Sequence, residues 1–151
     1  MSLLELKRMT RETQRLESYL QEDSAYGLLL DFYDSWFAQQ AAYDVWDDIV
    51  HRILPRQREV GLTLNPELEQ QAETALEHIE IVLAERFEAV VREFNLDLQD
   101  VPTQGDEDES DMDKLGYMLC DLEDLTHGEA VMSMVRVLRM RQRNQQKVRL
   151  S

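Results

Sequence analysis

Hydrophobic residues recur at intervals of three or four along nearly the whole chain, which is the spacing of an α-helix. No run alternates convincingly between apolar and polar residues, and no hairpin dipeptide such as Asn-Gly is present. We therefore predict an all-α fold, a single-domain bundle of four to five helices over residues 1–151. Before the fourth helix, the polar stretch at about 96–110 predicts an acidic, flexible loop.

A capping motif starts the first predicted helix, and Pro55 is predicted to end the second. Ser2 and Glu5 match a capping box, in which each side chain bonds the other residue's backbone N–H. The second helix is predicted from about Ser24 to Leu54, because a helix rarely continues through the residue before a proline. The first helix carries one apolar stripe that we expect to be buried in the bundle: Leu3, Leu6, Met9, Leu16 and Leu20, with Thr10 and Thr13 in its middle.

Similar signals define the remaining helices. Asn65 is the predicted N-cap of the third helix and Asn95 its left-handed C-cap, since asparagine tolerates that conformation. Ser110 is predicted to cap the fourth helix, and a capping box formed by Thr126 and Glu129 to start the fifth. The expected buried faces are Met112, Leu115, Leu119, Leu122 and Leu125 in the fourth helix, and Val131, Met134, Val135 and Leu138 in the fifth.

The second helix changes character along its length. Its apolar residues between 26 and 37 cover an arc of roughly 200°, at about 100° per residue, which exceeds the needs of a surface helix. Further on, one face carries Asp44, Asp47, Asp48 and His51. Three interpretations remain open: the helix breaks near 38–43, the core ends at this level and leaves the acids in water, or the acids point inward toward a metal or a basic group.

A metal site is an alternative use of these acids. Asp48 and His51, and again Asp124 and His127, have the carboxylate-x-x-histidine spacing of di-metal helical bundles, although that pattern normally has Glu. The other predicted buried stripes hold no centred acid, so one helix alone would have to enclose the ion. A calcium loop starting at Asp106 fails as well, because its sixth position is Asp111 instead of glycine. We expect no metal or other cofactor.

Charge and cysteine content indicate which partners and which cellular compartment suit the protein. The net charge is −15, and residues 1–135 hold ten cations against 31 acids. Such a field repels nucleic acid and anionic membranes and attracts basic partners, although plain solubility explains it equally well. Cys120 is the only cysteine, which favours a reducing compartment. We expect no signal peptide and no membrane span, and therefore a cytoplasmic protein.

After Val135 the chain carries six cations and no acid. This basic C-terminal helix and tail cover about 127–151. On the fifth helix, Arg136, Arg139 and Arg143 fall on the side opposite the apolar stripe. We expect this arginine face to lie near Asp44, Asp47 and Asp48, or the tail to fold back on the loop acids. Contact with nucleic acid is the alternative, which a short basic helix without aromatics supports poorly.

These observations favour a non-enzymatic, cytosolic protein-interaction module of the adaptor, inhibitor, immunity or chaperone type, which binds a basic protein. The alternatives are a metal-dependent helical-bundle enzyme and a nucleic-acid-associated regulator. A homodimer also fits, because the second helix has more apolar surface than one bundle stripe requires. The candidate partner-binding residues are the tryptophans, the acids and the arginines of these surfaces: Trp36, Trp46, Asp44, Asp47, Asp48, Asp106, Glu107, Asp108, Glu109, Arg136, Arg139 and Arg143.

Overall fold

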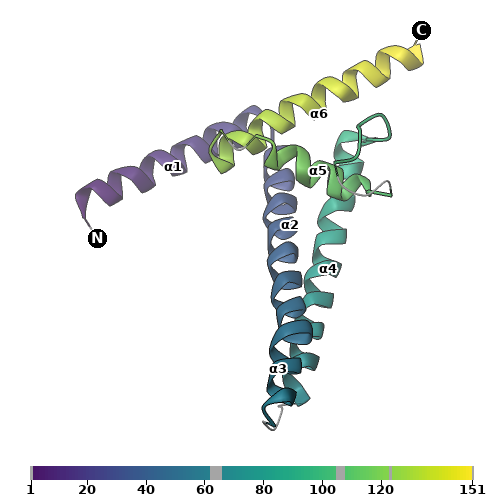
Figure 1. The fold of residues 1–151 in the computed structure, drawn as a ribbon. Helices are drawn as coiled ribbons and strands as arrows, with labels where there is room; N and C mark the ends of the chain where they lie inside the picture. Colours follow the sequence, from purple (N-terminus) through teal and green to yellow (C-terminus); the bar gives the residue numbers. More distant parts are fainter. Residues whose placement is uncertain (1, 62–65, 105–107, 123, 151) are drawn as a thin grey trace. The chain divides into compact units, whose positions relative to one another are not determined.

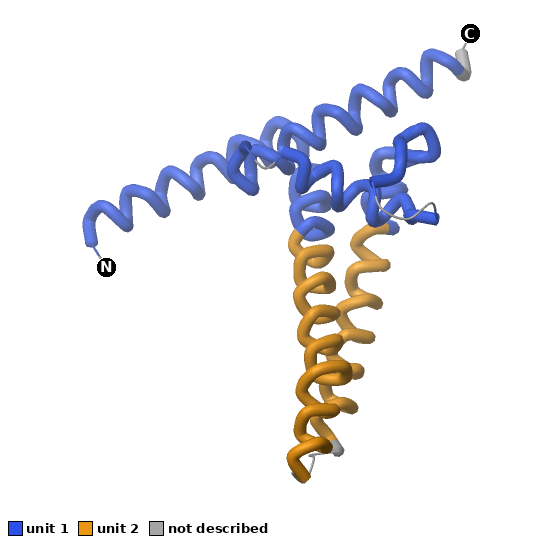
Figure 2. The backbone as a smooth tube through the Cα atoms, viewed as in Figure 1, with its two compact units in different colours: residues 1–33, 88–151 blue, residues 34–87 orange. Residues whose placement is uncertain are grey.

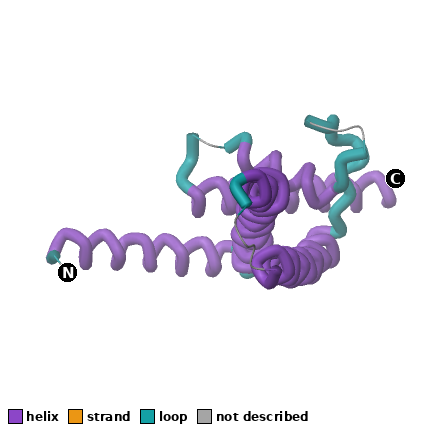
Figure 3. Tube along the Cα trace, turned by 60° about the horizontal axis from the view of Figure 1, so that its bottom comes forward, coloured by secondary structure: helices purple, strands orange, loops and turns teal. Residues whose placement is uncertain are grey.

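In the computed structural model, residues 2–61, 66–104, 108–122 and 124–150 are described, and these ranges contain helices and loops but no strand (Figures 1 and 3). The predicted all-α fold is confirmed. Because α2, a π-helical segment and α3 follow one another without interruption, the described ranges form five continuous helical segments. The elements are α1 (Leu3–Glu22), α2 (Ala25–Asp48), the π-helix (Ile49–Ile53), α3 (Leu54–Glu59), α4 (Pro66–Phe94), α5 (Asp111–Cys120) and α6 (His127–Leu150).

The chain divides into two compact units (Figure 2). Unit 1 comprises residues 1–33 and 88–151, and unit 2 comprises residues 34–87. The division falls within α2 and within α4. Whether both units fold together as the single predicted domain stays a prediction. None of the helices in the described ranges is both long and apolar enough to cross a membrane.

The capping predictions are confirmed wherever the caps are described. Ser2 and Glu5 form the reciprocal capping box of α1, and Ser110 Oγ accepts the N–H of Asp113 at the start of α5. Asn95 ends α4 with φ 51°, in the left-handed region. The Thr126 hydroxyl accepts the N–H of Glu129, whose carboxylate accepts the N–H of Thr126. The predicted N-cap Asn65 lies outside the described residues.

The region around Pro55 differs from the prediction. The chain does not end its helix at Leu54 but passes through the π-helix into α3, where Pro55 occupies the first turn. The N–H of Leu54 bonds the carbonyl of Ile49, five residues back. This wider turn shifts the hydrogen-bond register, so the missing N–H of proline is tolerated. The break that we considered at 38–43 is absent, since α2 is continuous there and contains no proline to interrupt it.

The core of unit 1 is assembled from α2, α4, α5, α6 and the loop before α5. The predicted stripe of the fifth helix is confirmed as buried, whereas α5 ends at Cys120, so Leu122 and Leu125 of the predicted fourth stripe lie beyond it. Each fully buried large apolar side chain contributes about 1.5–3 kcal/mol. The buried apolar residues are Ala25, Tyr26, Leu29, Phe32, Tyr33, Val90, Phe94, Leu98, Leu115, Leu119, Ala130, Val131, Met132, Met134, Val135 and Leu138.

Unit 2 pairs α2 from Asp34 onward and its continuation with α4 up to Phe87 (Figures 1 and 2). Arg86 on α4 donates a hydrogen bond to the hydroxyl of Ser35 on α2. Trp36, one of the candidate partner-binding residues, is buried here. Its spacing on α2 directs it into the core, as aromatic residues at helical spacing most often are. Trp46 is half-buried and lies 5.8 Å from the ring of Tyr43.

The loop before α5, which we predicted to be flexible, has anchored residues in its described part. Leu98 is fully buried. The ammonium of Lys114, itself buried, donates to the carbonyl of Leu98 at 3.1 Å, and the N–H of Leu98 donates to Asp111 at 3.3 Å. Asp106 and Glu107 lie outside the described residues. Asp108 is exposed, and the Glu109 carboxylate accepts the N–H of Gln104.

Candidate functional site

The acidic face of α2 lies at the surface of unit 2. Asp44 is exposed, and the side chains of Asp47 and Asp48 are about half exposed. Asp47 contacts the ring of His51 at 2.9 Å, and Asp48 contacts Arg52 at 3.2 Å. Each partner lies four residues further along the same helical rod. Asp47 and Asp48 therefore have charged or polar partners on their own helix, and their side chains also contact water. The acids are thus in water, but the core does not end at this level, because Ile49 and Leu54 further along the rod are buried.

The candidate metal ligands do not converge on a common point. His51 is held by Asp47, while Asp48 is directed to Arg52. Asp124 is exposed in a turn, and His127 begins α6 with its ring stacked on Tyr33 at 4.8 Å. Across the described ranges, no group of three or more His, Cys, Asp or Glu residues is arranged to hold a metal ion.

Two arginines of the predicted face, Arg136 and Arg139, have other partners than the two sets that we predicted. Arg136 makes a bidentate contact with Glu22 at the end of α1, at 2.9 and 3.2 Å. Arg139 binds Asp23 at 2.8 and 3.1 Å and Glu93 at 2.7 Å. These carboxylates at helix ends, distant in sequence, are brought to α6 only by the packing of unit 1. Arg141, in contrast, binds Asp100 of the predicted acidic loop, as the second alternative expected.

Arg139 is the centre of this cluster. Its guanidinium lies 4.6 Å from the centre of the Phe94 ring, so it stacks on an aromatic face while it bonds two carboxylates. The hydrogen bond from Arg139 holds the pKa of Asp23 below its ordinary value, although burial acts in the opposite direction. Hydrogen bonds to Asp23 and Glu93 raise the pKa of Arg139. The cluster therefore ties the ends of α1 and α4 to α6. Arg143, the third residue of the predicted face, is exposed.

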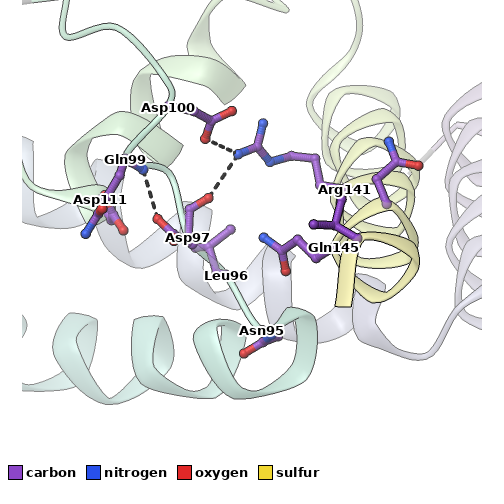
Figure 4. Close-up of a pocket in the computed structure, with 10 residues that line it drawn as sticks. Asn95, Leu96, Asp97, Gln99, Asp100, Asp111, Arg141 and Gln145 are labelled. Carbon is purple, nitrogen blue, oxygen red and sulfur yellow. Dashed lines mark hydrogen bonds and ion pairs between the residues drawn. The ribbon is translucent and has the colours of Figure 1, made fainter. Parts of the chain in front are cut away.

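An open cleft of about 890 Å³ lies between the segment after α4 and the C-terminal half of α6 (Figure 4). Arg141 reaches across it to the carboxylate of Asp100 and, at 2.9 Å, to the backbone carbonyl of Asp97. The contact with Arg141 lowers the pKa of Asp100. These contacts of Arg141 fasten the segment to α6, whereas the side-chain oxygen of Gln145 in the lining is buried without a hydrogen-bond partner among the described residues. The lining residues are Asn95, Leu96, Asp97, Gln99, Asp100, Asp111, Arg141, Asn144, Gln145 and Val148.

A second polar group in unit 1 surrounds Tyr33. Its hydroxyl donates to the sulfur of Cys120 at 3.5 Å, and its ring stacks on His127. Burial, together with the bond to Cys120, raises the pKa of Tyr33, so the hydroxyl stays protonated. The hydrogen bond to Cys120 joins α2 to α5, and the ring stack on His127 joins α2 to α6. These contacts hold the three helices together.

The largest departure from the sequence prediction is α1. No residue of this 20-residue helix is buried. The apolar stripe that we expected inside the bundle is open to solvent, with exposed fractions of 70% at Leu3, 52% at Met9 and 39% at Leu16. Leu20 at the end of the stripe lies beside Gly27 of α2, whereas Leu3, Leu6 and Met9 stay exposed.

The C-terminal end of α1 is nevertheless held in place. The ring of Tyr19 lies 5.2 Å from that of Tyr26, and the ion pairs of Glu22 and Asp23 bind α6. Arg15 lies 3.9 Å from Glu129. Figure 2 shows the helix leaving the rest of unit 1 beyond these contacts. The anchored end therefore presents the apolar stripe without covering it.

The hydroxyls of the two threonines within the stripe are hydrogen-bonded within α1. The hydroxyls of Thr10 and Thr13 donate to the carbonyls four residues back, Leu6 and Met9, each at 2.9 Å. Such bonds satisfy the hydroxyl within its own helix. A partner that covers the stripe would consequently meet threonine methyl groups and would leave no hydroxyl donor without an acceptor.

Comparisons with known proteins add no identity. No protein-family model, curated protein or solved structure matches this chain.

Sequence reasoning identified the apolar stripe of α1 but did not predict that it is exposed. The available signal was its heptad spacing, in which Leu6, Thr13 and Leu20 follow at seven residues and Met9 and Leu16 do the same. That spacing is typical of a seam with another helix.

Proposed function

We propose that this protein is a non-enzymatic protein-interaction module that binds a helix of a protein partner along the exposed stripe of α1. The observation that carries the proposal is a 20-residue amphipathic helix without a buried residue, fixed at one end. In proteins, helices are stabilised mainly by packing of their apolar face. An apolar face this long that stays open is a typical mark of an interaction surface.

The charges beside the stripe favour a partner helix that is locally basic. At about 100° per residue, Glu5 and Glu12 lie along one edge of the stripe and Glu17 along the other. The cations Lys7, Arg8, Arg11 and Arg15 lie on the opposite side of the helix. A partner helix with cations beside its own apolar residues would meet opposite charges at both edges. A membrane-surface helix also carries Lys and Arg on its polar face, so it is the glutamates beside the stripe, which anionic lipids would repel, that favour a protein partner.

The competing functions have less support. Arg136, Arg139 and Arg141 are engaged with carboxylates of the same chain. A nucleic acid would have to displace these contacts, which weakens the proposal of a nucleic-acid regulator. The carboxylates and histidines proposed for a metal enzyme contact residues of their own helix or a neighbouring ring.

The test compares a double leucine variant with a single leucine variant of the same helix. Leu6→Asp with Leu16→Asp places charge in the stripe, whereas Leu4→Asp changes a leucine that is 78% exposed on the opposite side. Each protein would be purified gently from the cells that make it, treated with an amine-reactive cross-linker that reaches Lys7, and analysed by mass spectrometry. We expect cross-links from Lys7 to another polypeptide in the wild type and the Leu4 variant, and their loss in the double variant. Equal cross-linking in all three proteins, or binding only to anionic vesicles, would contradict the proposal.

A further inference from the structure

We infer that the partner of α1 is a second copy of this chain, which presents the C-terminal half of α6. The inference rests on the function proposed above and names the helix that covers the stripe. On α6, Val137, Met140 and Val148 are each at least 41% exposed and, with Asn144, share one side of the helix. This side is distinct from the buried stripe that includes Val135 and Leu138.

The charges at the edges of this second face are opposite to those on α1. Arg143 and Lys147, both exposed, lie along one edge of the α6 face. Arg141 lies along the other edge, where it is already bound to Asp100 of its own chain. The stripe of α1 is flanked by Glu5, Glu12 and Glu17. Docking α1 of one copy on α6 of another therefore places carboxylates beside Arg143 and Lys147 along one edge of the contact.

The same charges disfavour the symmetric alternatives. Two copies of α1 packed stripe to stripe would bring their glutamates together, and two copies of the α6 face would bring Arg143 and Lys147 together. Like charges at the edges of paired helices select against such pairings. The pattern thus specifies α1 with α6 of the other copy.

The dimensions and directions of the two helices allow both pairs to form at once. The segment from Leu6 to Leu16 spans roughly 15 Å, and that from Val137 to Val148 roughly 17 Å, at 1.5 Å per residue. Figures 1 and 3 show α1 and α6 leaving the rest of unit 1 in opposite directions. A two-fold axis beside their junction places α1 along the partner's α6 and α6 along the partner's α1, a closed pair of equivalent contacts.

A charge-swap experiment tests this pairing. The acid-swapped variant carries Glu12→Lys and Glu17→Lys, one on each edge of the stripe, and leaves the capping box intact. The base-swapped variant carries Arg143→Glu and Lys147→Glu. We expect the wild type to be a dimer by sedimentation velocity at micromolar concentration and each variant to dimerise at least tenfold more weakly. An equimolar mixture should form a heterodimer, because both of its α1–α6 pairs again join opposite charges.

Matched controls separate a specific contact from a change in net charge. Glu73→Lys with Glu77→Lys changes two exposed acids of α4 by the same charge and should leave dimerisation unchanged. Circular dichroism should give equal helix content for all variants. Independently of any substitution, amide hydrogen exchange of α1 in the wild type should slow as protein concentration rises.

The outcomes distinguish this inference from the proposed function. A wild-type protein that remains monomeric at about 100 μM, with exchange of α1 independent of concentration, would overturn the dimer. Cross-links from Lys7 to a different polypeptide would in that case still support the proposed function. A wild-type dimer that tolerates both charge swaps, or is not restored in the mixture, would show that another face joins the copies and would also overturn the inference.

Discussion

Asp23 serves two elements at once. Its carboxylate accepts the N–H of Ala25 at 3.0 Å, which caps the beginning of α2, and it accepts two hydrogen bonds from Arg139 on α6. The side chain is only 18% exposed, so these contacts are partly shielded from water. Hydrogen bonds to a charged group in such a position contribute about 1.5–3 kcal/mol.

This geometry predicts a pH-dependent stability. Asp23→Asn keeps an oxygen for the cap but removes the charge that Arg139 binds, so it should lower the free energy of unfolding by about 2 kcal/mol at pH 7. Because folding depresses the pKa of Asp23, this contribution is fully present above the ordinary value of 3.8 and is lost as the pH falls through the lower folded value. Urea unfolding from pH 7 to pH 3 should therefore give a wild-type advantage that is constant above about pH 5 and shrinks below pH 4. A difference that does not change with pH would contradict the role of the charge.

The partners of Arg139 illustrate the limit of sequence reasoning at this scale. Its position opposite the buried stripe of α6 followed from helical spacing. Its contacts with Asp23 and Glu93 did not, because these residues are 116 and 46 positions away in the chain. Nothing local distinguishes them among 31 acids.

At the scale of elements, the end of α4 depends on a left-handed residue. Asn95 has φ 51°, and the N–H of Leu96 bonds the carbonyl of Val91 across the helix end. The left-handed conformation costs ordinary residues about 1–2 kcal/mol and costs glycine almost nothing.

We therefore predict opposite effects for two substitutions at this position. Asn95→Ala should reduce the free energy of unfolding by about 1 kcal/mol, while Asn95→Gly should be neutral or slightly stabilising. Urea unfolding of the two variants beside the wild type measures the difference. If alanine were tolerated as well as glycine, the left-handed cap would have no energetic role at the end of α4.

At the π-helix between α2 and α3, in contrast to the cap at Asn95, the sequence rule did not predict the structure. Pro55 predicted a helix end, yet the helical rod continues for another five residues. The rule concerns a regular α-helix, in which the proline ring meets the carbonyl four residues back. A single wide turn removes that conflict, and a proline does not by itself reveal whether the chain will make one.

At the scale of the whole molecule, α1 is attached without contributing a buried residue. Removing residues 1–14 eliminates three of the five apolar residues of the stripe, Leu3, Leu6 and Met9, but retains Tyr19, Glu22 and Asp23. This truncation should change the free energy of unfolding by less than about 0.5 kcal/mol, when measured by urea at a concentration where the protein is monomeric.

A longer truncation provides the contrast. Removing residues 1–23 also deletes the ring contact with Tyr26 and both ion pairs to α6, and should cost about 2 kcal/mol or more. Strong destabilisation by the shorter truncation would mean that the stripe of α1 packs within its own chain, which would also remove the basis of the proposed function.

The sequence by itself determined the local structure of this protein. Caps at Ser2, Asn95, Ser110 and Thr126 act within a few residues, and apolar spacing acts within one helix, so both can be read without knowledge of the fold. The all-α class and the buried face of α6 followed from these short-range rules.

Only the tertiary structure decided which faces meet. The stripe of α1 has the same pattern whether it is covered or exposed, because burial depends on which other helices reach it. Likewise, the packing of unit 1 chose Glu22, Asp23 and Glu93 as partners of the α6 arginines and buried Leu98 within an acidic loop. These contacts join residues far apart in the chain, and the free energy of such contacts depends on a spatial arrangement that local sequence does not contain.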